Sequence, residues 1–433
     1  DVNKAPTLIP IYGHSDYICG PEAAHINISG QTGLATKTSY AIFLAYSILA
    51  QSEKENNPTA IILFNVKRGD LLRLHKLPRD SIDDIQNKLK EWIKKVGETE
   101  RSYKEILDMW EKAFNEGIKP WNFGIKYFTY PSDPYLNDSE YLKGYKYVRL
   151  YTYGLGDISV EELIAALYRP GELRQEPQIG TLHTYFDTAQ SINVYPDNLT
   201  FNDLLEDFRK FKKYFNRQRY DEAIRLGRET NAKVEIEDWH QATVAAIFRR
   251  VNAFLRRAKR VIKSTSAHGN PIVWDDIEPN KIHVIQLYGL DDAEKRLVVN
   301  AVLRILVEGL EFRKGPVKRV VVIADELNKY APKRESPIKE QLIDIAARGR
   351  DIQLSLIGIQ QFASEIDEEV YGNCSTKVVG RTDIAEISSE IYKYLGDFKK
   401  VCSELRKGEM MIYHPLYSAP LLIRFPIPLH LLT

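Results

Sequence analysis

The ten residues GQTGLATKTS (Gly30–Ser39) lie between an apolar run, HINIS (25–29), and a stretch with helical periodicity, SYAIFLAYSILAQS. A strand, a glycine-containing loop and a helix in this order form a site at which backbone N–H groups bind phosphate. The usual loop sequence is G-x-x-x-x-G-K-[ST]. Here Lys37 and Thr38 match its end, but Thr36 replaces the last glycine, and Gly30 lies one residue too far from the lysine. An ordinary strand-to-helix turn is the alternative, and the loop alone does not decide between the two.

The composition limits the classes of function. At 433 residues, 44% of them hydrophobic and 27% charged, the chain has ordinary globular composition and is long enough for two or three domains, or for one domain with large insertions. Its 60 basic and 59 acidic residues give a net charge of +1, so any surface for nucleic acid must be local. Three scattered cysteines without C-x-x-C spacing indicate reduced thiols in a cytoplasmic protein, not disulfides or a zinc site. No apolar run is long enough to span a membrane.

Short apolar runs, each followed by a turn or helix pattern, recur in the first and last parts of the chain. Besides HINIS, the expected strands are 59–67, 281–290, 318–326, 354–361 and 376–383. The run 59–67 is continuously apolar, as in a strand covered on both faces, and the runs alternate with helices. This pattern predicts an α/β fold with a mainly parallel sheet. The closing stretch, GEMMIYHPLYSAPLLIRFPIP, predicts a terminal β-hairpin.

The middle of the chain has a different character, because long charged amphipathic segments such as 201–215 and 242–263 dominate it. We therefore expect a first core segment (1–70), a mainly helical insertion (71–265) and a second core segment (266–433). The densest basic cluster, RRVNAFLRRAKR (249–260), lies in the insertion and sets its arginines opposite an apolar face. Such arginines contact nucleic-acid phosphates without selecting a sequence, but a solubilising helix face is the commoner explanation.

Two acids end one of the expected strands. RVVVIADE resembles a Walker B element, in which Asp325 would hold Mg²⁺ and Glu326 would polarise the attacking water. Acids at the carboxyl end of a strand lie in the crevice where open α/β sheets bind ligands. The alternative is that they only begin a loop or cap a helix. Combined with Lys37, which would reach the β- and γ-phosphates, and Thr38, which would hold Mg²⁺, they favour a nucleotide site.

Further polar candidates follow in the same region. Gln360 and Gln361 end the strand LSLIGIQQ, where an amide can sense a γ-phosphate or orient water, although a polar strand end explains them too. Arg348 and Arg350 lie in LIDIAARGRDIQ, and an arginine from a neighbouring subunit can stabilise transition-state charge. Arginines also suit the last turn of a helix, so both explanations stay open. The histidines have no metal-ligand spacing, and Mg²⁺ is the single metal expected.

In this order the motifs resemble the HerA-like ATPases of the HerA/FtsK superfamily. The blocks that carry the resemblance are PIYGHSDYICGPEAAHINISGQTG, IHVIQLYGLDDAEKRLVVNAVLRIL, VVVIADELNKYAP, IAARGRDIQLSLIGIQQFASEI and LRKGEMMIYHPLYSAPLLIRFPIP. They cover the two core segments, while the helical middle has no specific match. The resemblance implies a RecA-like P-loop NTPase fold with a large helical insertion and a C-terminal β-hairpin. Members of the family also have an N-terminal barrel, which is missing from residues 1–433. Because the sequence begins without methionine, we expect that residues upstream of Asp1 are missing.

The resemblance also implies the site residues. The residues expected to bind ATP are those of the loop: Gly30, Gln31, Thr32, Gly33, Leu34, Ala35, Thr36, Lys37, Thr38 and Ser39. The resemblance implies that Thr38 and Asp325 bind Mg²⁺ and that Glu326 and Gln361 take part in hydrolysis. The family's arginine corresponds to Arg350, with Arg348 and Arg381 as further candidates. Thr36 departs from the family pattern, and it is costly if its position requires a positive φ.

The function implied is a cytoplasmic, homo-hexameric, Mg²⁺-dependent ATPase that translocates on double-stranded DNA. Its implied partner is a nuclease or a sirtuin-like effector, in DNA processing or antiphage defence, with no membrane involved. Two alternatives stay open: a conjugation or type IV secretion motor of the same superfamily, and a ring that binds ATP only as a scaffold for an effector. Thr36 keeps the scaffold open, whereas Glu326 and Gln361 favour hydrolysis.

Overall fold

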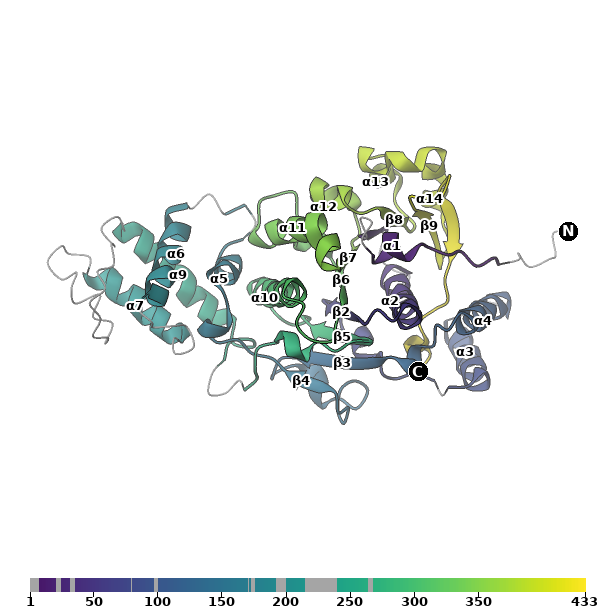
Figure 1. Cartoon of the computed structure of the whole chain (residues 1–433), viewed down its shortest axis with the longest axis horizontal. Helices are drawn as coiled ribbons and strands as arrows, with labels where there is room; N and C mark the ends of the chain where they lie inside the picture. The colour runs from purple at the N-terminus through teal and green to yellow at the C-terminus, as the bar shows by residue number, and fades with distance from the viewer. Residues whose placement is uncertain are drawn as a thin grey trace.

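A ten-stranded sheet forms the centre of the protein (Figure 1). The computed structural model describes residues 8–20, 25–31, 36–78, 80–96, 100–169, 171–172, 176–191, 200–214, 240–263 and 268–433. The strands are β1 (Ile26–Ser29), β2 (Thr59–Asn65), β3 (Gly124–Thr129), β4 (Val148–Leu150), β5 (Lys281–Gln286), β6 (Arg319–Asp325), β7 (Leu354–Ile359), β8 (Thr376–Val379), β9 (Glu409–Tyr413) and β10 (Leu421–Arg424). Their order across the sheet is β10-β9-β8-β1-β7-β6-β2-β5-β3-β4.

The sheet is mainly parallel, as the sequence predicts. All neighbouring pairs from β8 across to β4 are parallel. The expected terminal hairpin is confirmed, because β9 and β10 pair antiparallel and β9 pairs antiparallel with β8. The carboxyl ends of β1, β7, β6 and β2 therefore lie side by side at one edge, where a ligand of an open α/β sheet binds.

Alternate side chains of the central strands enter two separate cores. Val320 and Val322 of β6 pack with α10 (Asp292–Glu311) and α11 (Pro337–Ile352) on one face of the sheet. Val321 and Ile323 pack on the other face with α2 (Thr36–Glu55). Burial on both faces explains why these strands are continuously apolar in the sequence instead of alternating.

Between residues 71 and 265, the part of the chain that the structure describes contains helices and the two strands β3 and β4. Helices α3 (Ile82–Val96) and α4 (Glu100–Asn115) pack near the C-terminal end, where Trp110 Nε1 donates to the Ile427 carbonyl (2.9 Å). A second group of helices lies at the opposite end of Figure 1: α5 (Val160–Leu167), α6 (Glu176–Ser191), α7 (Phe201–Tyr214) and α9 (Gln241–Arg257). Short helices complete the described chain: α1 (Ser15–Ile18), α12 (Glu368–Gly372), α13 (Ile384–Ile387) and α14 (Lys399–Glu404).

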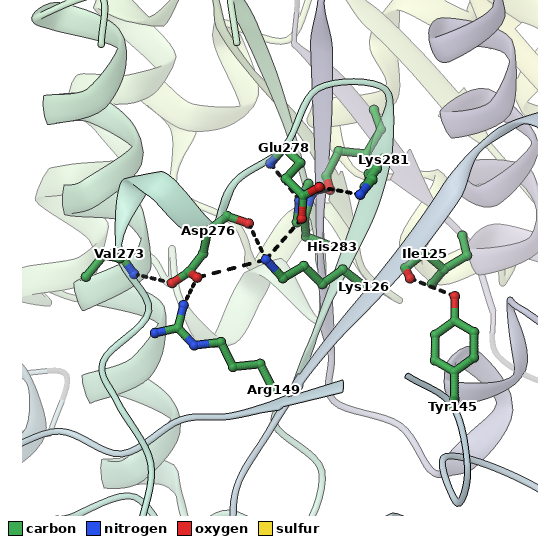
Figure 2. Close-up of polar contacts among 10 residues, drawn as sticks. Ile125, Lys126, Tyr145, Arg149, Val273, Asp276, Glu278, Lys281 and His283 are labelled. Carbon is green, nitrogen blue, oxygen red and sulfur yellow. Dashed lines mark hydrogen bonds and ion pairs between the residues drawn. The ribbon is translucent and has the colours of Figure 1, made fainter. Parts of the chain in front are cut away.

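Strands β3 and β4 differ from the expectation of a mainly helical segment, and their charged residues explain why. Figure 2 shows Lys126 of β3 between the Glu278 carboxylate (3.1 Å) and the Asp276 carbonyl (2.9 Å), while Arg149 of β4 forms an ion pair with Asp276. Beside them the Glu278 N–H donates to Nε2 of fully buried His283 (3.0 Å), and burial lowers the pKa of His283 to about 4. The strands are thus charged because they bind the loop before β5.

Acid is expected to destabilise the protein through His283. Its folded pKa of about 4 lies below the ordinary 6.5, so between these values the unfolded chain binds a proton that the folded chain does not. The free energy of unfolding therefore falls as the pH drops through this window, by at most roughly 3 kcal/mol. His283→Gln should flatten the pH dependence of the thermal midpoint, although His25 and His430, whose pKa values are also lowered by burial, keep part of it. The control is exposed His240→Gln; equal slopes for His283→Gln and this control would contradict the prediction.

The three cysteines of the chain, Cys19, Cys374 and Cys402, are buried and unpaired. Burial raises the pKa of Cys19 to about 11. Within the described ranges, no helix combines the length and the apolar content needed to cross a bilayer.

Candidate nucleotide-binding site

The candidate site is built from the carboxyl ends of four adjacent strands. Gly30 follows β1, Asp325 ends β6, and Gln361 lies just beyond β7. Lys67, two residues beyond β2, completes the row. Because these strands are neighbours in the order β1-β7-β6-β2, residues from four distant parts of the chain meet at one edge of the sheet.

Backbone contacts fix the first residues of the loop. The Gly30 N–H donates to the Gln361 carbonyl (3.2 Å), and the Gln31 N–H donates to the Arg381 carbonyl (2.8 Å). Gly30 has a φ of 137°, and a Cβ there would lie 3.0 Å from the Gly380 Cα. A glycine is therefore required at position 30 both by conformation and by space. The middle of the loop, Thr32–Ala35, lies outside the described residues.

The departure at Thr36 has a conformational explanation. Helix α2 begins at Thr36, so this residue has the helical backbone, whose φ is negative. The cost that a threonine would carry at a position of positive φ does not arise. The two residues that follow, Lys37 and Thr38, lie in the first turn of the same helix and point their side chains to the loop and to β6. Ser39 is buried in this turn.

Lys37 folds back over the start of the loop. Its ammonium donates to the Gly30 carbonyl, and only 5% of the residue is exposed. Burial and, to a smaller extent, the nearby charge of Lys67 lower the pKa of Lys37 to about 8, while Asp325 acts in the opposite direction. An incoming phosphate would supply the anion that this buried ammonium lacks.

Thr38 and Asp325 meet as a metal site requires. The Thr38 hydroxyl donates to Asp325 Oδ2 (3.1 Å). The Lys67 ammonium lies 2.7 Å from this hydroxyl and 2.6 Å from the same carboxylate oxygen. A hydroxyl and a carboxylate are oxygen ligands of the kind that Mg²⁺ prefers, and here they already hold a cation, so the residues fit the metal. The sequence analysis did not single out Lys67, although its position just beyond an apolar strand was a usable signal.

Glu326 adopts a backbone conformation that is uncommon for its residue type. Its φ of 58° and ψ of 43° lie in the left-handed region, and its N–H donates to Asp325 Oδ1 (3.0 Å). The carboxylate, 40% exposed, forms an ion pair with Lys329 (2.6 Å). Strained residues of this kind are concentrated at functional sites. Glu326 directly follows Asp325 at the end of β6, which is the position expected for a water-activating acid.

The structure separates the two glutamines. Gln360 is buried, and its Nε2 donates to Asn27 Oδ1 of β1 (2.7 Å), so it faces the interior of the sheet. Gln361 is exposed, and its carbonyl holds the first N–H of the loop. Arg381, also exposed, follows β8 and holds the second. Gln361 and Arg381 therefore flank the loop from its two sides.

Arg348 and Arg350 lie far from this edge in the same chain. Both belong to the last turns of α11, whose end precedes the start of β7. Six residues of strand separate that start from Gln360, a span of roughly 20 Å. Arg348 forms an ion pair with Asp344 (2.5 Å), while the Arg350 side chain is 56% exposed. Within one chain, the structure does not bring either arginine to the loop.

A second polar feature lies beside the insertion. A cavity of about 900 Å³ separates α9 from the start of α10. The charged residues that line it are the arginines Arg169, Arg249, Arg250, Arg257 and Arg296 and the acids Glu172, Asp291 and Asp292. Arg250 pairs with Glu172 (3.0 Å), and Arg296 donates to the Ala165 carbonyl (2.6 Å). The basic cluster of the sequence thus faces, in part, an open cavity.

Comparison with solved structures supports the fold. The chain is similar to the bacterial conjugative coupling protein TrwBdeltaN70 in its unbound form, with a TM-score of 0.54 at 12% identity, covering 94% of this chain and 85% of that one. TrwB in complex with the non-hydrolysable ATP analogue ADPNP gives 0.54 at 12%, covering 94% and 86%. TrwB with ADP and Mg²⁺ gives 0.53 at 12%, again covering 94% and 86%. No protein-family model matches the chain, and no curated protein matches it in sequence. The likeness extends over nearly the whole chain and identifies a RecA-like P-loop NTPase fold.

Proposed function

We propose that this chain is a Mg²⁺-dependent ATPase that works as a homo-hexameric ring and couples hydrolysis to movement along double-stranded DNA. The observation that carries the proposal is the convergence of Lys37, Thr38, Asp325 and Glu326 at one edge of the sheet, beside Gln361. The TrwB structures, which share the fold, contain ADPNP or ADP with Mg²⁺. This supports the same class of ligand here.

Each residue has a role that its position permits. The loop N–H groups and Lys37 would bind the phosphates. Thr38 and Asp325 would hold Mg²⁺, which would offset the negative charge of the phosphates. Glu326 would orient the attacking water and take its proton, after leaving Lys329. Gln361 would contact the γ-phosphate or the water from the side of β7. Arg350 would act on the site of a neighbouring subunit, because its own site lies at the opposite edge of the sheet.

The arginine-lined cavity is our candidate for DNA contact. Arg169, Arg249 and Arg257 line it. The acids Glu172, Asp291 and Asp292 also line it, but among the described residues these three arginines form no ion pair with a carboxylate. The Arg257 guanidinium donates to the Ala253 carbonyl of its own helix (3.2 Å) and keeps further N–H groups for a ligand. Guanidinium groups suit phosphate, and contacts to the DNA backbone are independent of DNA sequence. The position of the cavity, between the insertion and the core, would link DNA binding to the ATPase core.

The setting in which the motor works has two candidates. The motif blocks favour a HerA-like ATPase that acts with a nuclease or sirtuin-like effector in DNA processing or defence. The likeness to TrwB over 94% of this chain favours a motor for conjugation or secretion. We rank the HerA-like function first, because the motif blocks that resemble HerA extend through both core segments. Co-purification of the chain from its native host would distinguish an effector partner from membrane components of a secretion apparatus.

The proposal predicts ATP turnover that double-stranded DNA stimulates. The double substitution Arg249→Glu/Arg257→Glu should abolish the stimulation and leave DNA-free turnover intact, because it reverses two charges in the cavity and none at the loop. It should also reduce the slope of log affinity for DNA against log salt by about 2. Arg256→Glu is the matched control, since this exposed arginine lies on the same helix outside the cavity. ATP binding without turnover, with or without DNA, would favour the scaffold instead.

A further inference from the structure

Lys67 is held in its position by a buried amide. Asn65, the last residue of β2, is fully buried, and its Oδ1 accepts the Lys67 N–H (3.2 Å). Its Nδ2 donates to the Arg68 carbonyl (3.2 Å) and to Gln286 Oε1 of β5 (2.8 Å). One amide thus fixes the turn on both sides of Lys67 and ties it to the next strand. The backbone of Lys67 is therefore fixed at a place from which its side chain reaches Thr38 and Asp325.

The contact satisfies a carboxylate that has little access to water. The Asp325 side chain is 6% exposed; its Oδ1 accepts the Glu326 N–H, and its Oδ2 accepts Thr38 and Lys67. A buried carboxylate without a cation is strongly disfavoured. Lys67 therefore stabilises Asp325 and also holds the Thr38 hydroxyl in place. These are the same two oxygens to which we assign Mg²⁺.

An ammonium and a divalent cation cannot share these oxygens. Two positive charges a few ångströms apart repel each other strongly at a partly buried site. The Lys67 side chain is 39% exposed and has a flexible four-carbon stem, so it has room to swing away from Asp325. The triphosphate of a bound nucleotide would give the displaced ammonium a new partner beside the loop.

We propose that the Lys67 ammonium is a displaceable resident cation: it holds Thr38 and Asp325 together in the nucleotide-free site and excludes free divalent metal until a nucleotide draws it away. This inference rests on the proposed assignment of Thr38 and Asp325 to Mg²⁺. It goes beyond that assignment, because it makes the site selective for metal that arrives with nucleotide. Lys67 is then a positioning residue and not a ligand of the metal.

The test measures metal binding without nucleotide. Mn²⁺ serves as the probe, and free Mn²⁺ is followed by electron paramagnetic resonance in titrations of the full chain. Lys67→Met is expected to bind one Mn²⁺ at least tenfold more tightly than the wild type, because the competing charge is gone. Lys67→Arg, which keeps the charge, should bind as weakly as the wild type. The double variant Lys67→Met/Asp325→Asn should lose the gained affinity.

Lys67→Met leaves a buried carboxylate unpaired, so its fold is checked by circular dichroism, and Lys67→Gln provides a second neutral variant. In both neutral variants added Mn²⁺ should raise the thermal midpoint more than in the wild type. Equal Mn²⁺ affinity in the wild type and the neutral variants, or no binding in any of them, would overturn the inference. Failure of the proposed function is distinguishable: a gain of Mn²⁺ affinity without ATP turnover in the wild type would leave the role of Lys67 intact.

Discussion

Glu326→Gln is expected to lower ATP turnover by a factor of ~10²–10⁴ while ATP remains bound. The glutamine keeps the size of the side chain but cannot take a proton from water. The left-handed backbone at this position sets the side chain at the end of β6, one residue beyond the Asp325 carboxylate, and the substitution leaves that backbone unchanged. The loss should therefore fall on kcat, with little change in the affinity for ATP.

Two measurements check this prediction: steady-state phosphate release, and equilibrium binding of a fluorescent ATP analogue. Glu365→Gln is a matched control. The Glu365 carboxylate accepts a hydrogen bond from Asn328 (2.9 Å), two residues after Glu326, and has no proposed role in the chemistry. This variant should turn over ATP at the wild-type rate. Wild-type turnover in Glu326→Gln would remove Glu326 from the mechanism, and loss of binding instead of turnover would show that the change had damaged the loop.

The fold was predictable because its signal is local. Each central strand, such as β6, is buried on both faces and therefore appears in the sequence as a continuous apolar run. The same is true of β2 and β7, while β1 and β5 are also buried but include polar residues. Strands β3 and β4 were missed because their charges, Lys126 and Arg149, are satisfied by acids more than a hundred residues away. An ion pair between residues so far apart in the sequence leaves no pattern in a short stretch of it.

The site was predictable in its outline for a related reason. Parallel strands bring their carboxyl ends to one edge of the sheet. The residues just after each strand are therefore candidates for the site even before the order of the strands is known. The order of the strands then decides which of these candidates meet at the site. The choice between Gln360 and Gln361 depends on which way the chain leaves β7, and Lys67 reaches Thr38 because β2 lies next to β6. The backbone of Thr36 likewise depends on where α2 begins, which the loop sequence does not specify.

Arg350→Ala is expected to lower turnover by about 10³-fold or more, the usual effect of removing an arginine that stabilises a phosphoryl-transfer transition state. In the proposed ring, this prediction concerns two neighbouring subunits. Arg350 lies before β7 and the loop lies beyond its other end, so no Arg350 reaches the loop of its own chain. Lys37→Ala should be equally inactive for a different reason, because it removes the ammonium that binds the phosphates. Arg348→Ala is the control, since Asp344 already engages that guanidinium.

Mixing the two inactive variants separates action across subunits from action within one. In a head-to-tail ring, an Arg350→Ala subunit with an intact loop can receive Arg350 from a Lys37→Ala neighbour. In an equal mixture about a quarter of the sites would be complete, so up to about a quarter of wild-type turnover should return. If Arg350 acted within its own chain, every subunit in the mixture would carry a broken site and no activity would return. Light scattering establishes that both variants assemble, because a variant that stays monomeric cannot complement. Recovered turnover would thus support the ring and the arginine together, whereas an inactive mixture of assembled rings would exclude Arg350 as a residue supplied by a neighbour.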